Sequence, residues 1–242
     1  MRIAQITDLH IGQEGENTFD IDVRANFQRI LHRIRVLAPD YMVVTGDLCY
    51  RDAAPEIMDY VKAELDRLDI PYYVIAGNHD DSTMLAQHFG IRTHLHDGEL
   101  YYCQVLDGFP VLFLDSARGQ LSARQKAWLQ EQLGKFTGPA LVFMHHPPLW
   151  ADVPYMDTNF PLQDRTEVAA ILQQAPYPVS VFCGHYHIDQ TVHEGSLQVH
   201  ITPSGFFQID PASAEFAVEH HRVGFRDISW EADRIRHRVI WV

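Results

Sequence analysis

Short apolar runs alternate with helical patterns through the first third of the chain. Runs typical of buried strands cover residues 2–7, 41–45 and 72–75. Residues 19–37, between the first two runs, carry apolar side chains at helical spacing, and Pro55 opens a second helix with an apolar stripe. This order predicts a parallel sheet whose strands are joined by right-handed helical crossovers.

The next part of the chain is richer in strands. The strand-like runs there are residues 101–105, 111–114, 141–144 and 179–183. An Asp107-Gly108 pair between the first two predicts an antiparallel hairpin, and a helical pattern near residues 166–175 separates the last two.

A capping-box pattern predicts another helix after the hairpin. Ser122 is followed three residues later by Gln125, which is typical of a helix N-terminus. The apolar pattern ends near Leu133, and Gly134 stands where a C-terminal cap is expected.

The remaining segments complete the predicted architecture. Residues 193–242 are rich in β-branched and aromatic residues, which predicts strands with turns at residues 194–195 and 231–233. Residues 147–163 form a proline-interrupted stretch that is long for a loop; such loops are usually either functional or disordered, and an active-site loop is one interpretation. Because the chain shows no repeat and no linker, we expect one α/β domain over residues 1–242.

The composition excludes several classes of protein. Apolar residues make up 46% and charged residues 21% of the chain, which rules out a disordered or collagen-like protein. The net charge of −13 repels polyanions, so duplex nucleic acid is not an expected partner. An acidic protein acts on an anionic substrate only where something local reverses the field.

Cysteine usage and hydropathy indicate the compartment. Cys49, Cys103 and Cys183 are scattered and form no CxxC pair, which favours a reducing environment. The N-terminus has no secretory-type apolar stretch, and no run approaches the ~20 apolar residues that span a bilayer. We therefore expect a soluble, cytoplasmic protein without a membrane partner.

Metal-binding residue types follow five of the apolar runs. These segments are Asp8-Leu9-His10, Gly46-Asp47, Gly77-Asn78-His79-Asp80, His145-His146 and Gly184-His185-Tyr186-His187. In open α/β sheets, ligands gather beyond the carboxyl ends of the strands, so we expect these side chains at one edge. Residues two apart in an extended segment face the same way, so Asp8 with His10, and His185 with His187, are each expected to act as a pair.

The chemistry of this set indicates a metal centre with seven donors. They are Asp8, His10, Asp47, Asn78, His145, His185 and His187. Carboxylate, imidazole and amide oxygen suit divalent Mn, Fe or Zn. Seven donors exceed the need of one four-coordinate ion and match two ions that share a carboxylate. The glycines before Asp47, Asn78 and His185 permit a close backbone approach at the strand ends.

The ordered series DLH, GD, GNHD, HH and GHYH, each after an apolar strand, resembles the calcineurin-like metallophosphoesterase superfamily over residues 8–187. The resemblance implies an α/β fold in which two mixed β-sheets pack face to face and are flanked by helices. It also implies that one ion binds Asp8, His10 and His187, that the other binds Asn78, His145 and His185, and that Asp47 bridges them.

The mechanism that we expect follows from these ions. Two metals about 3.5–4 Å apart lower the pKa of a shared water and neutralise the phosphoryl oxygens, which also answers the problem of the acidic net charge. His79 follows Asn78 and is expected to face the scissile phosphate as a general acid or charge stabiliser. Asp80 can fix the His79 tautomer, although Asp47 or a backbone carbonyl can do so instead.

Other residues near the motifs have weaker patterns. His146 either contacts the substrate or, as we favour, supports the centre through hydrogen bonds. His200 precedes a loop that either lines the pocket or packs elsewhere, and Cys49 and Cys183 are interpreted as small buried residues. The side chains that either stack a substrate ring or pack the long loop down are Trp150, Tyr155, Met156 and Phe160.

The resemblance also narrows the substrate. DLHIG, HHPP followed by Met156-Asp157, and GHYH are similar to the class III cyclic nucleotide phosphodiesterases and the related glycerophosphodiesterases. The chain departs from that branch at Gln163-Asp164, where an Asn is expected after the Met-Asp pair. The segments GDLCYRD and GNHD disfavour the protein serine/threonine phosphatases.

We therefore expect a metal-dependent phosphoric diester hydrolase in which a metal-bridging hydroxide attacks a small phosphodiester, with a 3′,5′-cyclic nucleotide as the first candidate. A phosphomonoesterase or nucleotide-pyrophosphate hydrolase on the same centre is the alternative, and a non-catalytic scaffold of this fold is a second. A scaffold is expected to have lost ligands, and none of the seven is missing here. Small members of the superfamily often pair, so the resemblance leaves a homodimer open.

Overall fold

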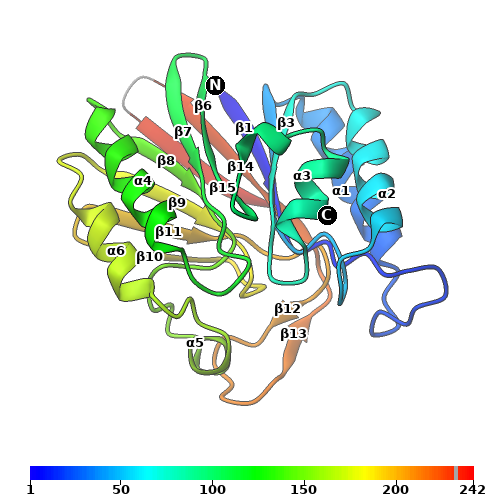
Figure 1. Ribbon diagram of the computed structural model, residues 1–242. Coiled ribbons are helices and arrows are strands. Elements are labelled where there is room, and N and C mark those ends of the chain that lie inside the picture. Colours follow the sequence, from blue (N-terminus) through cyan, green and yellow to red (C-terminus); the bar gives the residue numbers. More distant parts are fainter. Residues whose placement is uncertain (232–233) are drawn as a thin grey trace.

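Two large β-sheets face each other at the centre of the molecule, and helices cover the outer face of each (Figure 1). The computed structural model describes residues 1–231 and 234–242. The strand order is β15-β14-β1-β2-β3 in the first sheet and β10-β11-β9-β8-β7-β6 in the second. Both sheets contain parallel and antiparallel pairs, in agreement with the predicted class of two mixed sheets flanked by helices.

The first sheet is built from both ends of the chain. Its strands are β1 (Arg2–Ile6), β2 (Tyr41–Thr45), β3 (Tyr72–Ile75), β14 (Gly224–Glu231) and β15 (Arg234–Trp241). β1, β2 and β3 run parallel, with α1 (Val23–Leu37) and α2 (Pro55–Asp66) as crossovers, as the alternating pattern predicts. β14 pairs antiparallel with β1, so the C-terminal segment completes this sheet.

The first helix begins later than predicted. Phe19 and Asp20 have φ angles of 55° and 58°, so the chain turns before the helix starts. The side chain of Asp22 accepts a hydrogen bond from the N–H of Ala25 at 2.9 Å and caps the N-terminus. The other end agrees with the prediction, since the helix stops just before Pro39. Phe19 is thereby left exposed on a turn.

The second sheet has a parallel centre and antiparallel edges. Its strands are β6 (Tyr102–Leu106), β7 (Phe109–Phe113), β8 (Ala140–Phe143), β9 (Val179–Cys183), β10 (Gln190–Glu194) and β11 (Leu197–Ile201). β6 and β10 are the antiparallel edges. α4 (Ala123–Lys135) and α6 (Arg165–Gln173) cover its outer face (Figure 1).

The capping of α4 is only half as predicted. Ser122 Oγ accepts a hydrogen bond from the N–H of Gln125 at 3.1 Å. The Gln125 side chain does not close the box, because it bonds both the N–H and the carbonyl of Asp115 at 2.8 Å. The predicted glycine cap is wrong, since the helix continues through Gly134 and ends at Lys135.

Several short elements lie outside the predicted pattern. They are α3 (Ser82–His88), a 3₁₀ turn (Arg92–His94), β4 (Leu95–His96), β5 (Glu99–Leu100), α5 (Pro154–Asn159), β12 (Gln208–Ile209) and β13 (Val218–His220). The long loop at residues 147–163 therefore contains a short helix, which Pro154 opens. α5 and the β12–β13 hairpin lie at the same end of the molecule (Figure 1). Of the predicted turn at residues 231–233, residues 232–233 lie outside the described part of the chain.

A buried polar network joins the two sheets near the ends of β1, β2 and β9. Gln5 Nε2 donates to Thr45 Oγ1 at 3.0 Å and to the carbonyl oxygen of Cys183 at 3.1 Å. The Thr202 hydroxyl donates to Gln5 Oε1 at 2.6 Å and accepts from Arg226 Nε at 2.9 Å. A buried polar group without a partner costs about 1–3 kcal/mol, so this network specifies how the sheets meet.

Two histidines lie in the same interior layer, one on each sheet. The rings of His200 on β11 and His237 on β15 have centroids 4.0 Å apart, and Arg226 Nη1 donates to His237 Nδ1 at 3.0 Å. Burial is the main cause that lowers the pKa of His200 to about 2 and that of His237 to about 4. His200 therefore packs between the sheets and does not line the pocket over the strand ends.

Among the described residues, no helix is long and apolar enough to cross a membrane. One domain over residues 1–242 stays a prediction.

The buried His200 predicts loss of stability in mild acid. The unfolded chain binds a proton at this residue below pH 6.5, whereas the folded chain resists protonation until the pH is far lower, so stability falls as the pH drops through 6.5. Between pH 7 and pH 5, His200 alone is expected to lower the free energy of unfolding by about 2 kcal/mol. Denaturant unfolding of the wild type and His200→Phe at both pH values checks this, because the variant should lose about 2 kcal/mol less. An equal loss in both proteins contradicts the account.

Candidate metal centre

Five of the seven predicted ligands lie in left-handed turns directly after their strands. The φ angles are 53° at Asp8, 45° at His10, 51° at Asp47, 68° at His185 and 52° at His187. Residues other than glycine seldom adopt this conformation, and such strain gathers at functional sites. The first two turns support each other, since the N–H groups of Asp8 and His10 donate to the carbonyl oxygens of Gly46 and Asp47 at 3.0 Å.

These turns correct one expectation about pairing. Because His185 and His187 are not in an extended segment, they do not point to the same place as a pair. His187 lies with Asp8 and His10, whereas His185 lies with Asp47 and His145. Asp8 and His10 do fall in one group, as predicted, although through turns and not through strand geometry.

The glycines before the motifs allow the close approach that was predicted. A Cβ atom at Gly77 would overlap the Asp47 carboxylate, and one at Gly184 would overlap the Thr7 hydroxyl and the Asp8 carboxylate. The N–H of His185 donates to both oxygens of Asp8, at 3.2 and 3.0 Å. Backbone and carboxylate can meet at these points only because the side chain is absent.

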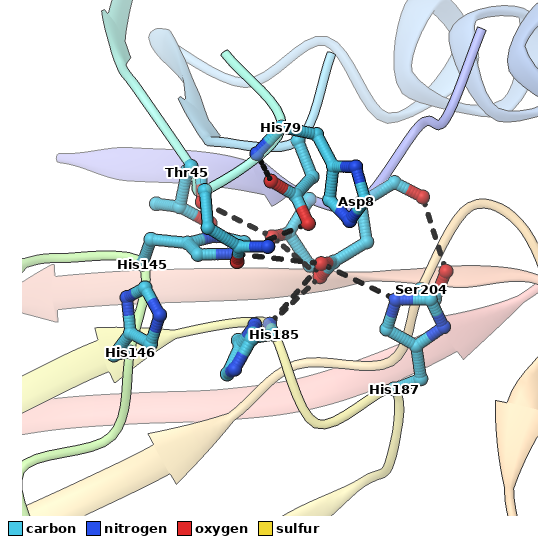
Figure 2. Close-up of polar contacts among 12 residues, drawn as sticks. Asp8, Thr45, His79, His145, His146, His185, His187 and Ser204 are labelled. Carbon is cyan, nitrogen blue, oxygen red and sulfur yellow. Dashed lines mark hydrogen bonds and ion pairs between the residues drawn. The ribbon is translucent and has the colours of Figure 1, made fainter. Parts of the chain in front are cut away.

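One group of candidate ligands surrounds the end of β1 (Figure 2). His187 Nε2 lies 3.4 Å from Asp8 Oδ1 and 3.1 Å from His10 Nε2. His10 Nε2 lies 4.0 Å from Asp8 Oδ1 and 3.6 Å from Asp47 Oδ2. Burial is the largest cause that lowers the pKa of His10, to about 3, so this ring is neutral at pH 7 and free to coordinate.

A second group surrounds the end of β8 and meets the first at Asp47. His145 Nε2 lies 3.3 Å from Asp47 Oδ2, 3.1 Å from Asn78 Oδ1 and 4.0 Å from Asp8 Oδ1. Burial favours the neutral ring, but the Asp47 carboxylate outweighs it and raises the pKa of His145 to about 9. The oxygens of Asp47, Asn78 and Asp8 around His145 Nε2 thus favour a positive charge at this position. Asp47 Oδ2 is the atom that both groups share.

Backbone carbonyls orient three of the four imidazoles. His145 Nδ1 lies 2.8 Å from the Thr45 carbonyl oxygen, His187 Nδ1 lies 3.1 Å from that of Phe207, and His185 Nε2 lies 2.9 Å from that of Phe160. A carbonyl oxygen only accepts, so each of these nitrogens carries a proton and a metal can bind only at the other ring nitrogen. At His145, whose pKa is raised to about 9, a metal would have to displace a proton from that nitrogen. The Phe207 and Phe160 carbonyls are contacts that no sequence motif indicates.

The donor set fits cations better than any partner that the chain supplies. Asp8 and Asp47 are buried, and no lysine or arginine side chain in the described part of the chain pairs with either. Isolated buried carboxylates are costly unless they are paired or coordinate a metal. His10 Nδ1 is also buried without a hydrogen-bond partner. These groups can hold metal ions.

His79 lies at the edge of this centre (Figure 2). Its N–H donates to Asp47 Oδ1 at 2.9 Å, and its ring lies 5.1 Å from that of His10. Of the three groups considered for fixing its tautomer, the structure places a backbone carbonyl there, since Nδ1 lies 2.9 Å from the carbonyl oxygen of Arg51. His79 also forms a further candidate ligand group with His10 and Asp47.

Asp80 does not orient His79. Its carboxylate accepts hydrogen bonds from the N–H groups of Leu48, Cys49 and Gly77, at 2.9–3.2 Å. Burial, with a contribution from Asp47, raises the pKa of Asp80 to about 6. Asp80 therefore ties the turn after β2 to the turn after β3, which positions Asp47 and Asn78.

His146 has the supporting environment that we favoured. It is buried, its Nδ1 lies 3.0 Å from Ser116 Oγ, and its ring centroid lies 4.1 Å from that of His185. Cys49 and Cys183 are also buried, and burial raises the pKa of both thiols. Neither thiol is a nucleophile at neutral pH.

Comparison with known proteins agrees with this geometry. Residues 1–189 match the calcineurin-like phosphoesterase family, and the chain belongs to this family. A protein of Fibrobacter succinogenes named a probable cyclic nucleotide phosphodiesterase is 33% identical over 99% of this chain and 93% of its own length. A protein of Arcobacter nitrofigilis named a probable glycerophosphodiester phosphodiesterase is 29% identical over 90% of this chain and 85% of its own length.

The fold is shared with a solved structure. A dimetal phosphatase from Danio rerio superposes with a TM-score of 0.70 at 16% identity, over 99% of this chain and 98% of that one. This likeness shows the fold alone. Family membership confirms the predicted metallophosphoesterase fold and a metal-dependent phosphoesterase, and the relatives' names agree with a phosphoric diester hydrolase.

Loss of the shared carboxylate charge should weaken metal binding. Asp47→Asn is expected to lower the affinity for Mn²⁺ by more than about 100-fold, because the shared Oδ2 loses its charge. Titration calorimetry on the metal-free protein measures this. Asp115→Asn is the control, since Asp115 is an equally buried carboxylate that accepts hydrogen bonds outside the centre. Equal losses in both variants would mean that the effect is structural.

Proposed function

We propose that this protein hydrolyses a small phosphodiester, with a 3′,5′-cyclic nucleotide as the substrate, at a centre of two divalent metal ions. The observation that carries the proposal is the shared Asp47 oxygen, which lies 3.6 Å from the ligand nitrogen of one group and 3.3 Å from that of the other. One ion would be held by Asp8, His10 and His187, the other by Asn78, His145 and His185, and both would share Asp47.

The donor types suit Mn or Fe, and Zn is acceptable to the same set. When bound, two such ions supply an activated water and neutralise charge on the phosphoryl oxygens. The chain itself supplies the fixed geometry, since the strand-end turns and backbone carbonyls hold the ligands before any ion arrives. Such preorganisation removes the cost of arranging the ligands during the reaction.

His79 is assigned to proton transfer and not to coordination. Its Nδ1 is engaged by the Arg51 carbonyl, so Nε2 is the nitrogen available to a substrate in the pocket. There it can protonate the leaving oxygen or stabilise its charge. Asp80 acts from behind as a positioning residue, through the backbone of residues 48, 49 and 77.

The charge around the pocket favours a diester over a monoester. The centre forms the floor of a pocket of about 300 Å³, and Arg51 is the one lysine or arginine among the described residues that line it. Its Nε already lies 3.7 Å from a Glu16 carboxylate oxygen. A diester carries one negative charge, whereas a monoester carries nearly two at neutral pH and a pyrophosphate more. The pocket offers little positive charge beyond the ions for those extra negative charges.

The relatives support the same choice. Both relatives described above are named as phosphodiesterases, one for cyclic nucleotides and one for glycerophosphodiesters. Cytoplasmic location and a homodimer remain proposals that rest on the sequence alone.

Relative rates on two aryl esters test the proposed reaction. The Mn-loaded protein is expected to hydrolyse bis(p-nitrophenyl) phosphate with at least roughly tenfold higher kcat/KM than p-nitrophenyl phosphate, because the pocket lacks side-chain charge for a dianion. Spectrophotometric assays of the released nitrophenol measure both constants. A preference for the monoester would contradict a diesterase and favour the monoesterase alternative.

A His79 variant separates proton transfer from metal binding. His79→Ala is expected to lower kcat by about 10²–10⁴-fold for a substrate with a basic leaving group, while the metal content per chain stays that of the wild type. Elemental analysis of the purified variant gives the metal content. Loss of metal together with activity would make His79 a ligand and overturn the assignment.

A further inference from the structure

Aromatic side chains form one side of the pocket above the candidate centre. Seven of the described residues that line this pocket are phenylalanine or tyrosine. Four of them, Phe19, Phe206, Phe207 and Phe216, are connected by five ring contacts, and we refer to these four as the aromatic wall. Tyr155 of the long loop contacts the wall, with its ring centroid 5.8 Å from that of Phe216.

The aromatic wall runs outward from the ligands themselves. The ring of Phe206 lies 5.2 Å from that of His10, and the ring of Phe207 lies 5.2 Å from that of His187. Phe216 lies 5.9 Å from Phe207 and 6.1 Å from Phe19 at the outer end. The wall therefore extends from the candidate ligands to the outer part of the pocket, where a group attached to a phosphate at the centre can contact it.

Exposed apolar side chains are concentrated at this mouth. Among the described residues, six large hydrophobic side chains are exposed, and three of them line this one pocket. These three are Phe19, Phe160 and Phe216, which are 52%, 46% and 44% exposed. Exposed apolar surface that gathers around a pocket marks a binding site, whereas scattered exposed residues need no explanation.

The backbone holds the two outer rings in place. Phe19 has a left-handed φ of 55°, in a turn closed by a hydrogen bond from the N–H of Asp20 to Asn17 Oδ1 at 2.8 Å. The loop that carries Phe216 is closed by a bond from the N–H of Asp210 to the carbonyl oxygen of Ala217 at 2.9 Å. Phe19 thus combines a strained left-handed backbone with an exposed apolar ring, a combination that points to a functional role, and Phe216 is an exposed ring held beside it.

The other aromatic candidate of the long loop lies elsewhere. Trp150 does not line the pocket, and the guanidinium carbon of Arg165 lies 3.3 Å from its ring centroid. Trp150 therefore lies against Arg165 at the surface, while Tyr155, Met156 and Phe160 from the same loop reach the pocket. This contrast makes Trp150 a natural control.

From these observations we infer that Phe19 and Phe216 form a stacking surface for a planar ring carried by the substrate, and that this surface selects nucleotide diesters over glycerol diesters. The inference rests on the proposed phosphodiesterase function. The rings of Phe19 and Phe216 stand at 62° to each other, so a flat base can stack on the face of one and contact the edge of the other. Such a base removes apolar ring surface from water, whereas a glycerol headgroup, which has no ring, leaves that surface exposed. Stacking of a base on an aromatic side chain is worth about 5- to 150-fold in affinity.

Substrate competition in the metal-loaded, full-length protein tests this selection. The ratio of kcat/KM for 3′,5′-cyclic AMP to that for glycerophosphoethanolamine, which has no ring, is expected to fall about 5- to 100-fold in Phe216→Ala and in Phe19→Ala. Phe216→Trp keeps a flat ring and should keep the wild-type ratio. Trp150→Ala, outside the pocket, should also keep it. An unchanged ratio in both alanine variants overturns the inference. This includes an equal fall of kcat/KM for both substrates, which would mean that the wall only packs the loops.

A binding measurement separates this inference from the proposed reaction. Adenosine 5′-monophosphate and glycerol 3-phosphate place the same phosphate at the centre with and without a base. Calorimetry should show that Phe216→Ala weakens the binding of adenosine 5′-monophosphate by about 5- to 100-fold and weakens the binding of glycerol 3-phosphate much less. If the wild type cleaves no diester but shows this pattern, the proposed function fails and the stacking surface stands. If diesters are cleaved and both ligands bind equally to wild type and variant, the stacking surface fails alone.

Discussion

Two buried carboxylates lie side by side after the neighbouring parallel strands β1 and β2, and the surrounding structure is organised to hold them there. Asp8 and Asp47 are almost fully removed from water, and four imidazoles close around them. Like charges in such a site repel unless a cation lies between them. The left-handed turns, the glycines without side chains and the carbonyl acceptors all serve to keep this arrangement from relaxing.

The site is held from both sheets at once, and a buried polar network crosses the otherwise apolar interior between them. Gln5 and Thr202 connect β1 to the segment after β11, and Arg226 extends the same network to β14. The candidate ligands follow β1, β2, β3, β8 and β9, and each group draws on both sheets, so a shift of one sheet against the other would pull apart the ligands within each group. The network that fixes the sheets therefore also fixes the centre.

The sequence predicts the strands, and the gathering of the seven candidate ligand side chains, because both follow from local patterns. An apolar run followed by Asp, His or Gly-Asn places the side chain at a strand end, and the structure brings these seven side chains together there, while their role as ligands stays a prediction. The backbone conformation at those strand ends is harder to predict from the sequence, because the left-handed turns at His185 and His187 are accompanied by contacts with Asp8 on another strand. The aromatic wall is even harder to predict from the sequence. Phe19, Phe207 and Phe216 lie in irregular segments without a period, and only tertiary packing brings them together.

We propose that side chains from five strand ends hold two cations on either side of one carboxylate. Anomalous scattering from crystals grown with excess Mn²⁺ tests it most directly. Two anomalous peaks are expected about 3.5–4 Å apart, with Asp47 between them. One peak should lie within bonding distance of His10 and His187, and the other within bonding distance of His145 and His185. A single peak at saturating metal, or two peaks that do not share Asp47, would contradict it.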